Sequence, residues 1–314
     1  MPFVPKKQAF NAHINEVVLG VGDKATAIGG QNVLPFHTFD AEIKNAPKIG
    51  VELTDLGMAE YTMPGEKAFY EGCTTVPEMA KRAESLEGAS FICLHLEGAD
   101  PNGLNKSVEE CVQLAKDVSD ATTLPLVIMG CKNIEKDAEL FTKVSEALQG
   151  KNILVFSARE ENYKSVGASA VMAYGQKVGA ESAVDINLAK QLNVLMTQLG
   201  VAPTSIVMNA GSAAAGYGYE YVASTLDRIR AAALAQSDTQ LQMPILTPVS
   251  PETWSVKESM VSEADMPEWG SAEERGIEME ITTAAACLAG GSDAVIMRHP
   301  AAIKAISEMI EALV

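Results

Sequence analysis

The sequence predicts an α/β fold of the (β/α)8 TIM-barrel type. From residue 49 onward, short runs rich in Val, Ile and Leu alternate with longer segments of helical period. Eight such pairs fit into residues 49–314, and a TIM barrel typically needs about 250 residues for its eight pairs. The apolar runs are continuous, as expected for parallel strands that helices cover.

The expected strands follow one another along the chain as "KIGVEL", "SFICLHL", "LPLVIMG", "NILVFSA", "SAVDIN", "SIVMNAG", "MPILTPV" and "DAVIMR". The expected helices begin near Val76, Ser107, Lys136, Asn162, Leu188, Glu220, Glu273 and Pro300. Several of them carry start or stop signals. The segment "NKSVEECVQLAK" has the pattern of a capping box, "TQLGV" ends on glycine, and proline stands in the first turn of the last helix.

A doubly wound open sheet is the alternative fold. Such sheets usually have fewer strands, and many carry a glycine fingerprint after the first strand. The segment after the first expected strand, "VELTDLGMAE", does not supply this fingerprint. The sequence therefore favours the barrel.

Residues 1–48 do not fit the strand–helix repeat. The segments "HINEVVLG", "KATAIGG" and "NVLPFHTF" are typical of short strands joined by glycine turns. We interpret residues 1–48 as a β-hairpin arm that closes the N-terminal end of a barrel spanning residues 49–314. No low-complexity linker separates the two parts.

Composition limits the classes of partner. The net charge is −17 and the pI is about 4.7, so neither nucleic acid nor an anionic membrane is an expected partner. No apolar stretch approaches the roughly 20 residues of a membrane span, and the N-terminus lacks the layout of a signal peptide. We expect a cytoplasmic protein. The five cysteines form no Cys-x-x-Cys pair, so we expect packing roles for them and no metal site in this chain.

Polar side chains follow most expected strands, where a TIM barrel binds its ligands. They are Glu52, Asp55, His95, Glu97, Asp100, Lys132, Asn133, Arg159, Glu160, Asp185, Asn187, Asn209, Thr247, Arg298 and His299. His95 and Glu97 are two positions apart, as are Asp185 and Asn187, so the members of each pair are expected to point the same way. Either pair could orient a ligand or make structural hydrogen bonds.

Two other features point to function. Lys132 is the one lysine at an expected strand end, but its place after the strand predicts a solvated amine and argues against a Schiff-base lysine of the aldolase type. Two connections are much longer than the others, and both tryptophans, Trp254 and Trp269, lie in the second. These tryptophans could anchor a partner at an interface or pin the loop to its own barrel.

The loop "NAGSAAAGYGYEY" combines small residues with three glycines and three tyrosines. It contains no lysine and no phosphate-loop pattern. Its small residues permit close approach of something broad. We expect residues 209–214 to form this surface, with Asn209 and Ser212 supplying hydrogen bonds.

Several long segments resemble the small (delta) subunit of the corrinoid iron–sulfur protein of the acetyl-CoA synthase/CO dehydrogenase pathway. They are "EGADPNGLNKSVEECVQLAK", "LPLVIMGCKNIEKD", "REENYKSV", "AVDINLAKQLNVL", "GYGYEYVASTLDRIRAAAL" and "VIMRHP". The resemblance runs from about "VLPFHTF" to the C-terminus. It implies a TIM barrel related to that of the methyltetrahydrofolate:corrinoid methyltransferase.

The resemblance also implies partners and a cofactor. A large subunit would carry the iron–sulfur cluster and the corrinoid domain, and the corrinoid (cobalamin) would lie at its interface with this chain. The cobalt would take a methyl group from the methyltetrahydrofolate methyltransferase and deliver it to acetyl-CoA synthase/CO dehydrogenase. We expect a non-catalytic subunit that contacts the corrinoid through Asp185, Asn187, Asn209, Ala210, Gly211, Ser212, Ala213 and Ala214.

Two other functions stay open. In the related methyltransferases, Asp and Asn at strand ends hold the pterin, and Asp185 and Asn209 occupy similar expected positions. The chain could therefore be a folate-dependent corrinoid methyltransferase with its own pterin site. An unrelated lyase or aldolase barrel is the third interpretation.

Overall fold

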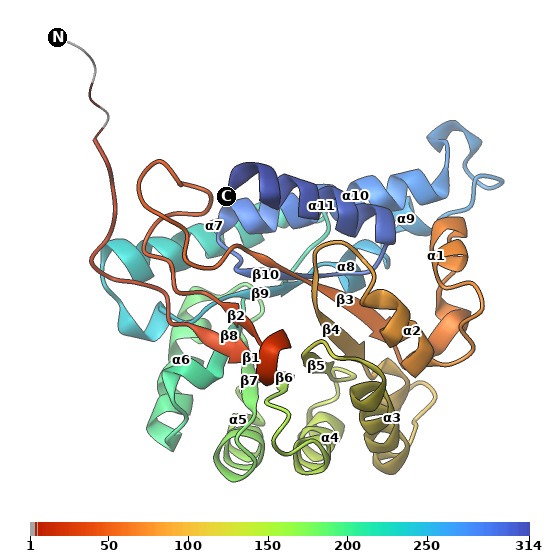
Figure 1. Cartoon of the computed structure of the whole chain (residues 1–314), viewed down its shortest axis with the longest axis horizontal. Coiled ribbons are helices and arrows are strands. Elements are labelled where there is room, and N and C mark those ends of the chain that lie inside the picture. The colour runs from red at the N-terminus through yellow and green to blue at the C-terminus, as the bar shows by residue number, and fades with distance from the viewer. Residues whose placement is uncertain (1–3, 5) are drawn as a thin grey trace.

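The computed structural model describes residue 4 and residues 6–314, and its centre is a barrel of parallel strands (Figure 1). Residues 1–3 and 5 of the predicted arm lie outside the described residues. The eight barrel strands are β3 (Lys48–Thr54), β4 (Ala89–His95), β5 (Leu126–Met129), β6 (Leu154–Ala158), β7 (Lys177–Glu181), β8 (Ile206–Asn209), β9 (Leu246–Pro248) and β10 (Ala294–Met297).

The strands pair in the order β8-β7-β6-β5-β4-β3-β10-β9. A parallel bridge between Met208 and Ile245 joins the two ends of this sheet, and the amide of Met208 donates to the carbonyl oxygen of Pro244 at 2.7 Å. The predicted barrel is therefore confirmed, and the open-sheet alternative is wrong.

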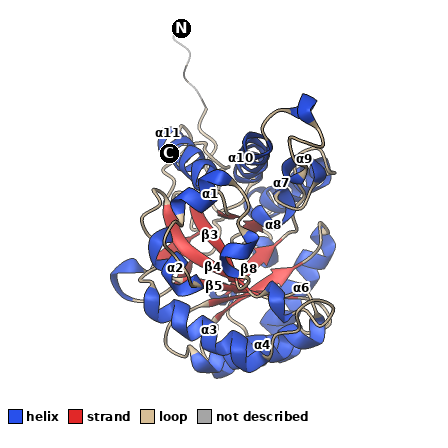
Figure 2. Ribbon diagram, turned by 90° about the vertical axis from the view of Figure 1, so that its right-hand side faces the viewer, coloured by secondary structure: helices blue, strands red, loops and turns tan. Residues whose placement is uncertain are grey.

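Helices surround the barrel, as the turned view shows (Figure 2). In chain order they are α1 (Pro64–Phe69), α2 (Val76–Ala83), α3 (Val108–Ala121), α4 (Ile134–Ala147), α5 (Tyr163–Val166), α6 (Ile186–Leu199), α7 (Tyr219–Arg230), α8 (Ser250–Thr253), α9 (Lys257–Met260), α10 (Ala272–Gly290) and α11 (Pro300–Leu313). Wider π-helical turns, Gly167–Ala173 and Ala231–Ala235, extend α5 and α7.

The predicted caps are present. The Ser107 hydroxyl accepts from the amide of Glu110 at 3.2 Å, and the Glu110 carboxylate accepts from the amide of Ser107 at 2.8 Å, which completes a capping box at the start of α3. Gly200 ends α6 with a φ of +108°, a conformation that favours glycine. Pro300 is the first residue of α11.

The fifth predicted strand is misplaced. The structure puts β7 at Lys177–Glu181, and residues 182–187 form the following loop and the start of α6. Ala183 and Val184 have φ values of +45° and +64°, which an extended strand excludes. The true strand gives a weak apolar signal because Gly179 lies at its centre. A Cβ atom at Gly179 would lie 2.6 Å from the ring of Phe156.

A hairpin of β1 (Val17–Leu19) and β2 (Thr26–Ile28) confirms two of the three strands predicted before the barrel. The third prediction is wrong, because residues 33–39 form turns in which Phe36 has a φ of +59°. Val17, Leu19 and Ile28 pack in one cluster with side chains inside the barrel. The Asn152 side chain donates to the carbonyl oxygens of residues 18 and 20. The hairpin thus covers the N-terminal end of the barrel (Figure 1).

A buried ion pair also holds this end together. Arg230, in the last turn of α7, pairs with Asp293, which directly precedes β10, and their side chains are 3% and 2% exposed. The same carboxylate accepts from the amide of Ile245 at 2.7 Å and from the side chain of Gln31. Asp293 therefore links α7, β9, β10 and the N-terminal segment.

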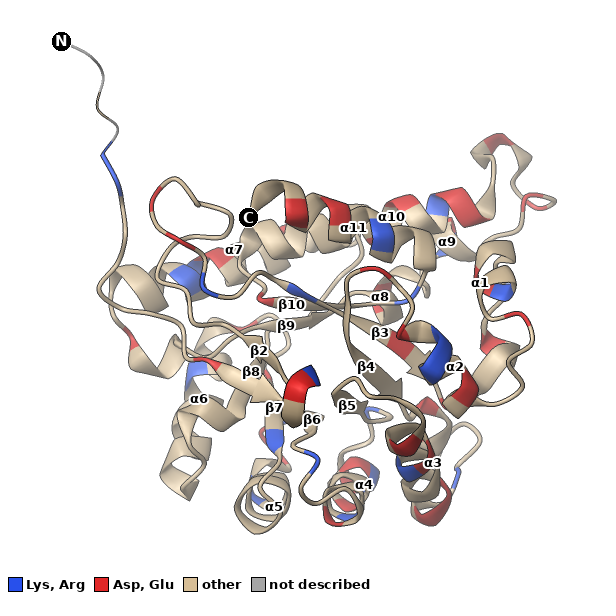
Figure 3. Cartoon of the chain, viewed as in Figure 1, with Lys and Arg blue, Asp and Glu red and all other residues tan. Residues whose placement is uncertain are grey.

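Acidic residues are spread over α2, α3, α4 and α10, whereas α5 and α6 contain few charged residues (Figure 3). In the described part of the chain, no helix is both long enough and apolar enough to cross a membrane. All five cysteines are free, and four of them are buried.

Candidate functional site

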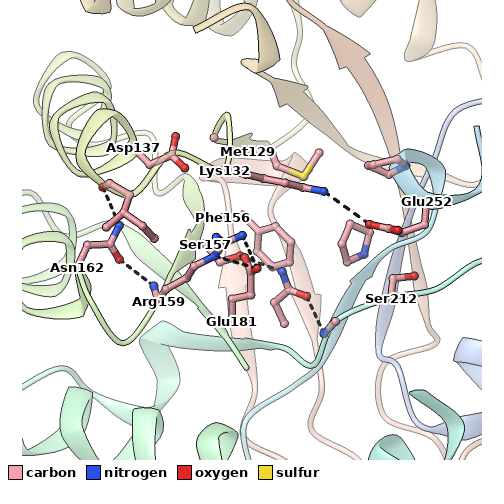
Figure 4. A pocket seen from close by; sticks show the side chains of 16 residues that line it. Met129, Lys132, Asp137, Phe156, Ser157, Arg159, Asn162, Glu181, Ser212 and Glu252 are labelled. Atoms are coloured by element: carbon pink, nitrogen blue, oxygen red, sulfur yellow. Dashed lines mark hydrogen bonds and ion pairs between the residues drawn. The ribbon is translucent and has the colours of Figure 1, made fainter. Parts of the chain in front are cut away.

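Two cavities occupy the C-terminal mouth of the barrel. The larger, of about 440 Å³, lies where β3, β4, β9 and β10 end. The smaller, of about 70 Å³, lies over the ends of β6, β7 and β8 (Figure 4). Lys132 and Pro251 line both cavities. The Lys132 amine lies 3.6 Å from the Glu252 carboxylate, so this ion pair marks the boundary between them.

A buried pair of ionisable side chains lies at the base of the larger cavity. His95 ends β4 and Glu52 lies on β3, and the His95 Nδ1 atom is 2.8 Å from the Glu52 Oε1 atom. Burial alone would lower the pKa of His95. The hydrogen bond and the negative charge of Glu52 together raise this pKa by a larger amount, so the pKa of His95 lies above its ordinary value. Burial raises the pKa of Glu52, and His95 lowers it below its ordinary value. Each group thus favours the charged form of the other, the imidazolium of His95 and the carboxylate of Glu52.

This pair predicts a pH dependence of stability. Its contribution to the free energy of unfolding should be fully present between about pH 4.5 and 6.5, the ordinary values for Glu and His. It should fall as pH rises through the elevated pKa of His95, and also as pH falls through the depressed pKa of Glu52.

Urea unfolding of wild type and His95→Asn from pH 4 to pH 9 checks this expectation. Asparagine keeps an N–H for Glu52 but does not titrate. The stability advantage of wild type should shrink as the pH rises above 6.5. An advantage that stays constant from pH 5 to pH 9 would contradict the assignment.

Further polar groups surround the larger cavity. Glu97 lies in the turn after β4 and lines the cavity, and its Oε1 atom is buried without a hydrogen-bond partner among the described residues. Burial raises the pKa of this carboxyl. Arg298 follows β10, donates to Glu66 at 2.8 Å and lies 4.4 Å from the centre of the Tyr61 ring. The cavity thus presents both signs of charge.

The smaller cavity is lined by groups that bind one another (Figure 4). Arg159 forms an ion pair with Glu181 at 2.7 Å. The Ser157 hydroxyl donates to the Glu181 carboxylate at 3.1 Å, and the Asn209 amide donates to the Ser157 oxygen at 2.9 Å. The Asn209 side-chain oxygen accepts from the amide of Gly211. Most of the hydrogen-bonding groups that line this cavity are therefore already paired with one another.

The predicted surface at residues 209–214 is exposed only in part. Asn209, Gly211 and Ser212 line the smaller cavity, and the Ser212 Oγ atom has no partner among the described residues. Ala210 and Ala214 are each 1% exposed, so these two residues are not part of the surface that the sequence predicts at residues 209–214. Ala213 is half-buried.

The pairing of Asp185 with Asn187 at a strand end is also wrong. Asp185 is the N-cap of α6, where its carboxylate accepts from the amides of Asn187 and Leu188. Both residues are exposed, and neither lines either cavity. By contrast, His95 and Glu97 do line one cavity together, as their spacing predicts.

The long connection after β9 is pinned to its own barrel by Trp254. This side chain is 8% exposed and stacks on His299 with 5.8 Å between ring centres. A Cβ atom at Gly276 would lie 2.3 Å from its ring. Trp254 is therefore no surface anchor, whereas Trp269 is half-buried between Lys257 and Arg275.

Lys132 is solvated, as predicted, with 61% of its side chain exposed. Ser157 and Glu181 are site residues that the sequence interpretation missed. Glu181 was missed because the fifth strand was placed too late in the chain. Among residue 4 and residues 6–314, no group of three His, Cys, Asp or Glu side chains is arranged to hold a metal ion.

The chain is similar to known proteins over most of its length. A family model described as CO dehydrogenase/acetyl-CoA synthase delta subunit matches residues 16–309. The chain is 32% identical to the acetyl-CoA decarbonylase/synthase complex subunit delta of Archaeoglobus fulgidus, over 99% of this chain and 71% of that protein. It is 30% identical to the subunit of the same name in Methanothermobacter thermautotrophicus, over 98% of this chain and 78% of that protein.

Solved dihydropteroate synthases share the fold. The enzyme from Vibrio fischeri superposes with a TM-score of 0.56 at 13% identity, over 85% of this chain and 93% of that one. The Thermus thermophilus enzyme gives a TM-score of 0.53 at 14% identity, over 95% of this chain and 100% of that one. At such low identity the likeness concerns the barrel alone. From the match over residues 16–309, the chain belongs to the family of CO dehydrogenase/acetyl-CoA synthase delta subunits.

Proposed function

We propose that the chain is the small subunit of a cytoplasmic, heterodimeric corrinoid iron–sulfur protein. The large subunit carries the iron–sulfur cluster and the corrinoid. The barrel of this chain covers the corrinoid. The observation that carries this proposal is the match of residues 16–309 to the delta-subunit family. The bound cobalt would supply the methyl-carrying chemistry between methyltetrahydrofolate methyltransferase and acetyl-CoA synthase in the reductive acetyl-CoA pathway.

The mouth of the barrel offers groups that suit such a ligand. A corrin is broad, apolar across its face and fringed with amides. Two oxygen atoms at the mouth, Ser212 Oγ and Glu97 Oε1, have no partner among the described residues, and an amide can satisfy either. The half-buried Ala213 leaves room for close approach beside Ser212. The role of this chain would be to bind and orient the ligand and to exclude water from one face.

The alternative, a folate-dependent methyltransferase, has less support. It rests on Asp185 and Asn209, which the structure does not bring together, because Asp185 caps α6 outside both cavities. The cavity at Asn209 measures about 70 Å³, whereas small-molecule sites usually measure about 300–1,000 Å³. Equilibrium dialysis of the full chain against methyltetrahydrofolate separates the two functions. Retention of one pterin per chain would favour the methyltransferase.

Replacing Ala213 with tryptophan tests the proposed contact. The bulky ring should hold the corrinoid away from the barrel, shift the visible spectrum of the complex and slow methylation of the cobalt by roughly 100-fold, the cost of misplacing a reacting group by about 1 Å. Stopped-flow absorbance of the complex measures both effects.

Ala312→Trp is the matched control. It places the same ring on an exposed position near the end of α11, and it should leave the spectrum and the rate unchanged. If Ala213→Trp assembles with its partner and is methylated at the wild-type rate with the wild-type spectrum, residues 209–214 do not meet the corrinoid.

A further inference from the structure

In the larger cavity, one ring nitrogen of His95 and one carboxylate oxygen of Glu97 form no hydrogen bond with the described chain. His95 is 7% exposed and lines the cavity. Its Nδ1 atom is occupied by Glu52, whereas no hydrogen bond joins its Nε2 atom to any described residue. Glu97, two residues later, lines the same cavity and has its Oε1 atom buried without a partner. A buried polar atom without a partner, such as Glu97 Oε1, indicates a ligand, since leaving it unsatisfied is costly.

The protonation of His95 decides what Nε2 can do. Because a carboxylate only accepts, Nδ1 donates to Glu52. Nε2 then accepts in the neutral ring and donates in the protonated ring. A ligand that pairs with both His95 and Glu97 in either state needs a donor and an acceptor on neighbouring atoms, and a primary carboxamide has both.

Other ligand classes fit less well. A carboxylate has no N–H to donate to Glu97 Oε1, and an ammonium has no acceptor for the protonated His95 ring. The described residues around the cavity do not form a group of three that could hold a metal ion. Leu56, Leu104 and Trp254 line the same cavity, and they offer apolar contact to the methylene groups of a short side chain that ends in an amide.

We infer that the larger cavity is a binding site for a primary carboxamide, held by His95 Nε2 and Glu97 Oε1, and that its occupant is an acetamide or propionamide side chain of the corrinoid. The identity of the occupant rests on the proposed function. The carboxamide chemistry rests on the cavity alone.

Propionamide tests the chemistry on the full chain. Titration followed by the ¹⁵N shifts of the histidine rings should show saturable binding at His95, with a dissociation constant on the order of millimolar for so small a ligand. Propionate and propylammonium should bind at least about tenfold more weakly, because each lacks one partner of the pair. Equal binding of propionate or propylammonium, or no binding of propionamide, would overturn the carboxamide site.

Two variants remove one partner each. Glu97→Met deletes the acceptor without leaving a buried charge, and His95→Asn deletes the Nε2 atom but keeps an N–H for Glu52. Each should weaken propionamide binding about tenfold, the effect of one lost hydrogen bond. The control is Glu139→Met, the same change on the exposed face of α4, and it should bind propionamide as wild type does. Wild-type affinity in both cavity variants would contradict the inference.

The complex tests the occupant. Glu97→Met and His95→Asn should bind the corrinoid-loaded large subunit about tenfold more weakly than wild type does, and should bind the corrinoid-free large subunit as wild type does. Equal weakening with both forms of the partner would assign the carboxamide to an Asn or Gln of the polypeptide and overturn the corrinoid assignment. If the wild-type complex holds no corrinoid, the proposed function fails, and the propionamide titration still decides the carboxamide site.

Discussion

Replacing Trp254 with alanine is expected to lower the free energy of unfolding by about 3–5 kcal/mol, the usual cost of removing a large buried aromatic side chain. The indole ring is 8% exposed, packs on Gly276 of α10 and stacks on His299 before α11. Its loss would leave a cavity between the connection after β9 and the two last helices. Urea unfolding followed by circular dichroism measures the change.

Trp269→Ala is the matched control from the same connection. The Lys257 amine and the Arg275 guanidinium lie 5.2 and 5.7 Å from the centre of its ring, and cation–π contacts that are not fully desolvated contribute only about 0.5–1 kcal/mol each. Its stability loss should therefore be clearly the smaller of the two. If this connection docks the partner, Trp269→Ala should also weaken that binding by about 1–3 kcal/mol. Equal stability losses in the two variants would contradict the assignment of Trp254 to the core.

Replacing Asp293 with alanine should also cost about 3–5 kcal/mol, because it leaves the Arg230 guanidinium buried without its counter-ion. The change also removes the acceptor of the Ile245 amide, where β9 begins. Both ends of the pair are almost fully buried, so the guanidinium has little contact with bulk water. Urea unfolding again gives the difference.

A double variant distinguishes the contribution of the ion pair to stability from that of the other contacts of Asp293. Adding Arg230→Met to Asp293→Ala removes the uncompensated charge, so the double variant should be more stable than Asp293→Ala alone. Disrupting the exposed pair of Lys143 and Glu146 should change stability little. A double variant as unstable as the sum of the single variants would show that Arg230 and Asp293 do not act as a pair.

The fold was predictable because its signal is repeated. Seven of the eight apolar runs coincide with barrel strands, and caps such as Ser107 and Gly200 mark helix ends by local chemistry. The exception is β7, in which glycine and charged residues interrupt the apolar run. In this region the sequence predicts a strand at residues 182–187 instead. These residues form the turn into α6, in which Ala183 and Val184 have positive φ values.

The site was predictable only where strand geometry dictates it. His95 is the last residue of β4 and Glu97 lies in the turn directly after it, so both reach the cavity at the end of this strand. The contact between Ser157, Glu181 and Asn209 joins three strands, so it depends on the order of the strands around the barrel. The burial of Ala214 and Trp254 could not be predicted either. It depends on how the segment after β9 and helix α10 pack in three dimensions, which local patterns do not encode.

Native mass spectrometry of the chain purified from its own cells tests the central claim most directly. We predict one copy of this chain, one copy of a larger polypeptide that carries an iron–sulfur cluster, and one corrinoid in the same particle. A particle that contains only this chain, as a monomer or a homodimer without any second polypeptide or corrinoid, would contradict the account.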